Sequence, residues 1–165
     1  MMLNKKIEVA LNQQMRDEFY SSHLYLAMAA FSDGLFLKGF AHWFRKQAEE
    51  ERQHAMKLFD YILERDGTPL ISEIKKPPQS FLSIVDVMSQ TLKHEEGVTA
   101  SIHKLYELSQ KEKDHATGIY LQWFITEQVE EEKSVADILA KIKMISAKEG
   151  GLLYLDKALA KRGVE

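Results

Sequence analysis

The stretch QAEEERQHAMKLF, Gln47–Phe59, has the apolar spacing of an amphipathic helix, yet it places polar residues on the face that should be apolar. Glu51 and His54 are three positions apart, so their side chains lie one turn apart on the same side of the helix. That side continues with Leu58, which indicates that it faces a protein core. A core does not accept an ionised carboxylate without a compensating charge. The stretch therefore predicts a long helix whose buried face carries a polar site.

The composition limits the class of protein to which this helix belongs. The chain has 165 residues, 45% of them hydrophobic, which suits a single compact domain over residues 1–165. Lys and Arg number 22 against 25 Asp and Glu, so we expect no nucleic-acid partner. The first residues lack the apolar core of a signal peptide, and no run of about 18 apolar residues occurs, so we expect a cytoplasmic protein without a membrane span. Cysteine is absent, so any bound metal must use oxygen and nitrogen ligands.

The positions of proline and glycine predict an all-α fold. Proline occurs only at positions 69, 77 and 78, which leaves the rest of the chain free for long helices. We expect helices over about 4–32, 37–65, 83–111 and 115–147, and a short fifth helix over about 152–162. Glycine should end the second helix at Asp66-Gly67. Segment 67–82 is too long for a tight turn, so it should cross the molecule and leave the second and third helices parallel. The result is an antiparallel four-helix bundle with a long crossover.

Each expected helix carries one inward face on which successive residues are separated by four and three positions. The four faces are Leu11, Met15, Glu18, Ser22, Tyr25 and Ala29; Phe40, Phe44, Gln47, Glu51, His54, Leu58 and Tyr61; Ile84, Met88, Thr91, Glu95, Val98, Ile102 and Leu105; and Leu121, Phe124, Gln128, Glu131, Val135 and Ile138. Every face has an acid near the midpoint of its helix, so the acids should meet at one level of the bundle. No Lys or Arg lies on these faces at that level, which leaves shared protons or bound cations to compensate the charge.

Two divalent cations would balance the four acids charge for charge, and His54 would add a nitrogen ligand. Bundles that bind two metal ions in this way use one Glu from each of two helices and a Glu-x-x-His pair from each of the other two. Here Glu51 and His54 form one such pair, whereas the fourth helix has Gln128 and Glu131 in its place. Oxygen-rich ligation with one imidazole suits iron or manganese, and paired ions can share a two-electron reduction of dioxygen.

The ligands can be divided between two ions. We expect one site from Glu18, Glu51 and His54, and a second from Glu51, Glu95 and Glu131. Glu51 would bridge the two ions, and Gln128 would hold water or oxygen nearby.

The sequence resembles the bacterial non-haem ferritins over essentially its whole length. The resemblance is carried by YSSHLYL after Glu18, and by EEERQHAMKLFDYI, KHEEGVT, LQWFITEQVEEEK and GLLYLDKAL. The Gln-x-x-Glu of 128–131 looks like the pattern of this family. Bacterioferritins place a haem-ligating Met directly after the bridging Glu, and Arg52 occupies that position here, so no haem is expected. Rubrerythrins need cysteines, which this chain lacks. The smaller DNA-protecting ferritins build their metal site between subunits, whereas this chain carries a full set of ligands within one bundle.

The resemblance implies an iron-storage protein of 24 identical subunits arranged as a hollow shell, with a role in iron homeostasis. Such a protein takes in Fe(II), oxidises it with dioxygen or peroxide at a site of two irons in each subunit, and stores ferric mineral inside. This activity is that of a ferroxidase. The fifth helix, over about 152–162, would then pack around a symmetry axis of the shell.

Further acids flank the central set, one step off the inward faces. Glu50, Glu127 and Glu130 lie on adjacent flanks of the second and fourth helices. The resemblance implies that acids at these positions hold a third iron. The alternative is a solvated acidic flank without a metal.

Three aromatic or histidine features complete the site expectations. Tyr25 lies two turns after Glu18 on the same face, and its ring should lean toward the metals. A packed core tyrosine is the alternative, while the resemblance implies a redox or hydrogen-bonding role. Trp123 is interpreted as a packing residue. No ligand role is assigned to the remaining histidines, which are His23, His42, His94, His103 and His115.

Two other functional classes remain compatible with the residues alone. The first is a di-metal oxidase or peroxidase that acts on a small substrate without storing iron, which would need an open pocket beside the metals. The second is a structural helical module in which the buried acids only share protons.

Overall fold

The computed structural model of the protein describes residues 3–145 and 150–163, and all regular structure in them is helical. The helices are α1 (Lys5–Gly34), α2 (Lys38–Glu64), α3 (Ile84–Lys111), α4 (His115–Ile145) and α5 (Gly151–Leu159). The predicted all-α fold is confirmed. The predicted end of the fourth helix at residue 147 lies outside the described residues, and α5 ends three residues before the predicted position 162. In the described part of the chain, no helix combines the length and hydropathy needed to cross a membrane.

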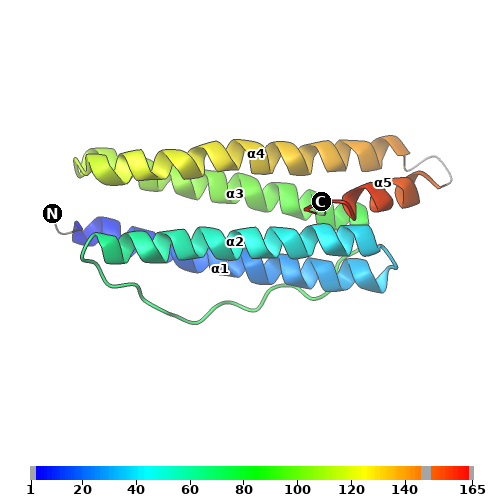
Figure 1. Cartoon of the computed structure of the whole chain (residues 1–165), viewed down its shortest axis with the longest axis horizontal. Coiled ribbons are helices and arrows are strands. Elements are labelled where there is room, and N and C mark those ends of the chain that lie inside the picture. Colours follow the sequence, from blue (N-terminus) through cyan, green and yellow to red (C-terminus); the bar gives the residue numbers. More distant parts are fainter. Residues whose placement is uncertain (1–2, 146–149, 164–165) are drawn as a thin grey trace.

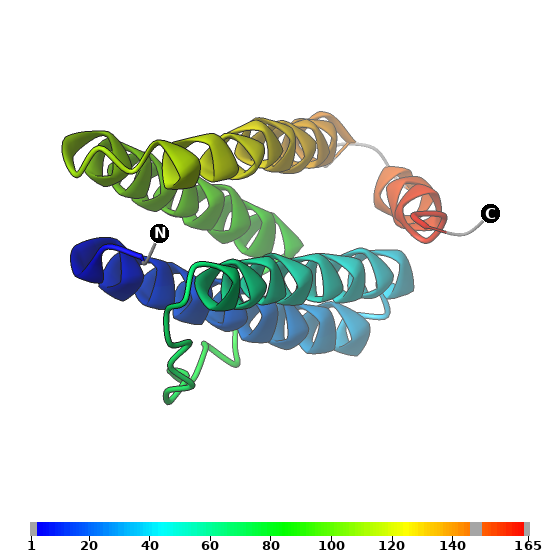
Figure 2. The ribbon, with the colours of Figure 1, turned by 60° about the vertical axis from the view of Figure 1, so that its left-hand side comes forward.

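The four long helices lie side by side along the long axis of the molecule (Figure 1). They form two hairpins, α1 with α2 and α3 with α4, which face each other as two layers (Figure 2). The segment that connects α2 to α3 has no regular structure, passes along the outer side of the α1–α2 hairpin, and carries the chain back to the end of the bundle at which α2 begins (Figure 1). Helices α2 and α3 therefore run parallel, as the length of this crossover predicts.

Side-chain caps start two of the long helices. The Asn4 carboxamide oxygen accepts a hydrogen bond from the Lys6 N–H at the start of α1, at 2.9 Å. At the start of α3, Ser83 Oγ accepts from the Asp86 N–H at 3.1 Å, and Asp86 accepts from the Leu82 N–H at 2.9 Å. Ser83 thus caps the start of α3, and Asp86 satisfies the amide of Leu82, the residue before the cap.

The prediction that a glycine C-cap ends α2 is wrong in one respect. Asp66, and not Gly67, takes the left-handed conformation, with φ of 56°. Asp adopts this conformation more readily than most residues, so it can end the helix itself. A Cβ at Gly67 would come within 2.9 Å of Ile62 and 3.1 Å of Leu3, so glycine is needed there for close packing.

The apolar core is divided into two clusters. One contains Tyr25, Met28, Phe40, Phe44, Val87, Met88 and Val135 with their neighbours, and the other contains Ile7, Leu11, Met15, Leu58, Ile62, Ile102 and Phe124 with theirs. On every long helix a buried polar stretch separates the residues of the two clusters. We call this stretch the polar layer, and its buried members are Glu18, Gln47, Glu51, His54, Glu95, Gln128 and Glu131.

Helix α5 packs against the first half of α2 and also contacts α4, and it lies between these two helices near one end of the bundle (Figures 1 and 2). Its Asp156 carboxylate accepts a hydrogen bond from the Phe40 N–H at 2.9 Å. A Cβ at Gly39 would overlap the backbone oxygen of Asp156, so glycine lets the two helices approach closely. Leu155 is buried in this contact. A nine-residue helix is marginal alone, and this packing stabilises it.

Candidate metal centre

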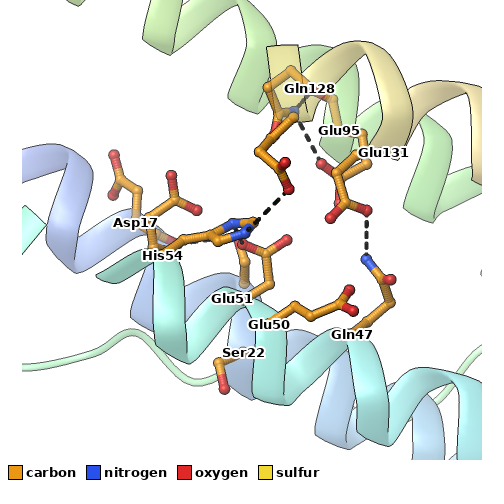
Figure 3. Close-up of polar contacts among 12 residues, drawn as sticks. Asp17, Ser22, Gln47, Glu50, Glu51, His54, Glu95, Gln128 and Glu131 are labelled. Carbon is orange, nitrogen blue, oxygen red and sulfur yellow. Dashed lines mark hydrogen bonds and ion pairs between the residues drawn. The ribbon is translucent and has the colours of Figure 1, made fainter. Parts of the chain in front are cut away.

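The polar layer brings together, from all four long helices, the six residues predicted to form the central metal site. Figure 3 shows five of them pointing into the space between the two hairpins. The six are Glu18 from α1, Glu51 and His54 from α2, Glu95 from α3, and Gln128 and Glu131 from α4. Their exposed fractions run from 0% for Glu95 to 7% for Glu131. Solvent therefore does little to compensate their charge.

The set assigned to the first site is gathered closely. Glu18, Glu51 and His54 each offer a ligand atom within 4.8 Å of the others. His54 Nδ1 lies 3.2 Å from Glu51 Oε2, but not at an angle that makes a hydrogen bond. As a result both oxygens of Glu51 and one oxygen of Glu18 are buried without a hydrogen-bond partner among the described residues. Buried oxygens without a donor are costly, and a cation between them would satisfy all three.

The set assigned to the second site is held by neutral donors instead. Glu95 accepts hydrogen bonds from the Tyr25 hydroxyl and, at 3.1 Å, from the Gln128 amide. Glu131 accepts from the Gln47 amide at 2.8 Å (Figure 3). Glu51, Glu95 and Glu131 do not bring their ligand atoms within 4.8 Å of one another as the first set does.

Gln128, which the sequence predicts to hold water or oxygen, instead donates hydrogen bonds within the protein through its amide NH2 group. It donates to a carboxylate oxygen and to the backbone oxygen of Glu95, the latter at 3.2 Å, and lies 3.2 Å from Thr99 Oγ1. In this conformation the amide fixes Glu95. Only its carbonyl oxygen is left to contact another molecule.

The three acids expected to form a third site do not converge in this structure. Glu127 lies close to the polar layer, and together with His54 and Glu131 it forms a second group of ligand atoms within 4.8 Å of one another. Glu50 instead forms an ion pair with Arg162, and Glu130 is exposed. Of the three, only Glu127 is positioned next to the central residues.

Burial controls the protonation of the central acids. It raises the pKa of Glu18 and of Glu51 well above the usual value, and the charges of neighbouring carboxylates raise both further. Burial also raises the pKa of Glu95, and it raises that of Glu131 to about 7, with help from the charge of Glu95. Without a cation, burial therefore favours the protonated forms of Glu18 and Glu51, and Glu131 is partly protonated at neutral pH. A divalent ion that binds them must displace those protons.

Two glutamines that support the central acids were not assigned a role from the sequence. The Gln14 amide donates to Glu18 at 2.9 Å, and its oxygen accepts from Ser101 at 2.6 Å. Gln47 holds Glu131 in the same way. Gln14 lies four positions before Glu18, and this spacing could have identified it. Nothing in the sequence connects Gln47 with Glu131, because they come from different helices.

Two aromatic residues border the site. Tyr25 is fully buried, and burial together with the Glu95 charge raises the pKa of its hydroxyl well above the usual value. Trp123 packs edge-on against the His54 ring with 5.3 Å between ring centroids, and Lys57 Nζ lies 4.3 Å from its centre. The contact with His54 agrees with the packing role expected for Trp123.

His94 packs against Tyr25 and is not among the predicted ligands. Its ring stands edge-on to Tyr25 at 5.9 Å, and its Nε2 lies 2.8 Å from Ser21 Oγ. Burial lowers its pKa to about 4, so the ring is neutral at physiological pH. It therefore contributes no positive charge to the polar layer.

A four-helix bundle with acids from every helix and a Glu-x-x-His pair at its midpoint belongs to the class of di-metal carboxylate proteins. Within that class, the chain is a member of the ferritin family, because residues 8–145 match its ferritin-like domain. It is 40% identical over 164 residues to a bacterial non-heme ferritin of Staphylococcus saprophyticus, covering 99% of this chain and 98% of that one. A bacterial non-heme ferritin of Staphylococcus epidermidis is 38% identical over 161 residues, covering 98% and 97%.

Solved structures agree with this membership. The open pore ferritin of the archaeon Archaeoglobus fulgidus superposes with a TM-score of 0.94 at 43% sequence identity, and the match covers 96% of each chain. The fold and the family are therefore shared along nearly the whole length.

Proposed function

We propose that the protein stores iron and is a ferroxidase: it binds Fe(II) in the polar layer, oxidises it, and retains ferric mineral inside an oligomeric shell. The observation that carries the proposal is the set of buried oxygens of Glu18 and Glu51, which lack donors and lie beside His54. The names of the bacterial relatives and the ferritin fold support the same reading. No haem is needed for this reaction.

We assign the first iron to Glu18, Glu51 and His54, and the second to Glu51, Glu95 and Glu131. Each Fe(II) gives up one electron. Two Fe(II) ions therefore supply the two electrons that, together with two protons, convert one O2 to one hydrogen peroxide. Carboxylate ligands favour Fe(III), the harder ion. For the second iron to bind, Glu95 and Glu131 must exchange hydrogen bonds with Gln128 and Gln47 for the metal.

A third iron would bind at Glu127 together with Glu50 and Glu130, after side-chain movement. Glu127 supports this position, since it already lies with His54 and Glu131. Such an ion would sit between the central pair and the protein surface.

Tyr25 is proposed to act on the reaction through Glu95, whose carboxylate it holds. In a turnover that also oxidises a third Fe(II), the three Fe(II) ions would supply three electrons and Tyr25 the fourth, so that one O2 takes up four electrons and four protons and becomes two waters. The hydroxyl of Tyr25 would lose its proton together with this electron. Tyr25→Phe removes the hydroxyl but keeps the packing of the ring against Phe44. We expect Fe(II) binding to be retained and oxidation to slow by about tenfold. If Tyr25 supplies an electron, samples frozen during turnover should contain a tyrosyl radical by electron paramagnetic resonance that the variant lacks. A tyrosyl signal of equal size in both proteins would exclude Tyr25 as its source.

The shell is proposed to contain 24 copies and to lie in the cytoplasm. Large apolar side chains remain exposed on the single chain, among them Phe36 at 84% and Leu82 at 92%. Exposed apolar groups of this size are usually covered by contacts with another molecule, and further copies of this chain would cover them.

Aerobic loading with Fe(II), followed by sizing of the native particle, tests the proposal. We expect a large particle that retains ferric iron in excess of about three ions per chain after passage over a desalting column. A small oligomer that oxidises Fe(II) but releases the product would instead indicate a di-metal oxidase without storage. A protein that neither binds nor oxidises iron would instead indicate a structural helical module in which the buried acids only share protons.

A further inference from the structure

Arg162, which follows α5, is held against α2 in a defined position. Its guanidinium forms an ion pair with Glu50 and donates a hydrogen bond to the Trp43 backbone oxygen at 3.4 Å. The guanidinium carbon lies 4.9 Å from the centre of the Trp43 ring. The backbone oxygen of Arg162 lies 2.7 Å from His42 Nε2. A surface arginine with one exposed ion pair would have no such fixed geometry.

The acid that Arg162 binds is adjacent to the metal centre. Glu50 directly precedes Glu51, and the two side chains project from neighbouring positions of α2 (Figure 3). The charge of Glu50 also contributes to the raised pKa of both Glu51 and Glu131. Glu50 is thus part of the electrostatic surroundings of the polar layer, although its carboxylate is turned to Arg162.

We propose that Arg162 is a built-in cation that competes with a metal ion for Glu50, so that the packing of α5 limits occupancy of the outer metal position. The inference rests on the proposed function, since it assumes that metal ions enter the polar layer. A carboxylate oxygen that pairs with a guanidinium must give up that pair to bind a metal. Metal binding at Glu50 and the Arg162 contact therefore oppose each other.

The position of Arg162 is set by the packing of α5 rather than by chance contact. Asp156 caps the start of α2 through Phe40, and Gly39 allows the close approach. These contacts fix the end of α5 near Trp43 and bring Arg162 within reach of Glu50. Coupling between two binding equilibria is reciprocal. If the Arg162 contact weakens metal binding at Glu50 by a given factor, a metal ion bound at Glu50 weakens the contact between α2 and the segment after α5 by the same factor.

Titration of the metal-free protein with Zn²⁺, a divalent ion that does not change oxidation state, measures the competition by calorimetry. We expect tight ions at the centre and a weaker outer ion, and Arg162→Gln should bind the outer ion about fivefold more tightly. Lys161→Gln is the matched control, because it removes one positive charge from an exposed neighbour that makes no ion pair with the described residues. Arg162→Lys keeps the charge but loses the planar contact with Trp43, and an intermediate affinity is expected.

The reciprocal effect is measured by hydrogen exchange of residues 151–162. In the wild-type protein, Zn²⁺ that saturates the outer position should speed exchange there, and in Glu50→Gln it should not. Equal outer affinities in Arg162→Gln and Lys161→Gln, with unchanged exchange, would overturn the inference while leaving the central ions in place. A protein that binds no Zn²⁺ at the centre would instead contradict the proposed function itself.

Discussion

Glu51→Ala is expected to slow aerobic Fe(II) oxidation at least about 100-fold and to remove the tightly bound metal ions. Glu51 is the one carboxylate assigned to both irons, and neither of its oxygens has a donor among the described residues. His54→Ala removes one ligand of one site, so its effect should be smaller. The measurements are the initial rate of Fe(III) formation and the metal content of the purified protein.

Glu49→Ala provides the matched control for this variant. Glu49 lies on the same helix but is exposed, and it pairs only with Lys46 at 3.0 Å. Its replacement should leave the oxidation rate within about twofold of the wild type. If both variants lose activity equally, the effect belongs to α2 as a whole and not to a ligand at position 51.

Glu51→Gln separates metal binding from stability. Glutamine keeps the size of the side chain and, like the protonated Glu51 of the metal-free protein, carries no charge, so the metal-free variant should unfold at an equal or higher temperature. Its loss of oxidation should nevertheless be nearly as large as that of Glu51→Ala, because an amide is a poor iron ligand. A variant that is fully active, or one that is strongly destabilised without metal, would argue against a bridging role.

The metal-free protein is expected to lose stability as the pH rises from 5 to 8, with the largest single contribution from the polar layer. The pKa of Glu131 is raised by burial to about 7 from a usual value of 4.5. A raised pKa means that the folded protein binds a proton that the unfolded chain releases, so stability is greatest below the unfolded pKa and falls as the pH passes the folded one. For Glu131 alone the loss is about 2–3 kcal/mol.

Denaturant unfolding of the metal-free protein at several pH values measures this loss. Glu131→Gln cannot titrate and should flatten the profile between pH 5 and 8, whereas a change at exposed Glu130 should not. Zn²⁺ should restore stability most at pH 8. At that pH the carboxyls of the polar layer have already lost their protons, so the ion binds them without proton competition and compensates their charge. A metal-free protein whose stability rises from pH 5 to 8 would show that the acids are not held in their protonated form.

The sequence by itself determined the helices, their inward faces and the level at which the acids meet. In a long helix the spacing of 3.6 residues per turn decides which residues share a face, and this relation is local. Glu18, Glu51, Glu95 and Glu131 could therefore be placed in the core before any contact between helices was known. The crossover followed equally from the length and proline content of segment 67–82.

Only the tertiary structure decided which buried acids have donors and which have none. Gln47 satisfies Glu131 from another helix, whereas the oxygens of Glu51 remain without a partner. Likewise Glu50, expected among the metal ligands, pairs with Arg162 from 112 positions further along the chain. Such pairings depend on side chains that meet only after the helices have packed. Periodicity reports the face of one helix at a time, so it carries no information about them.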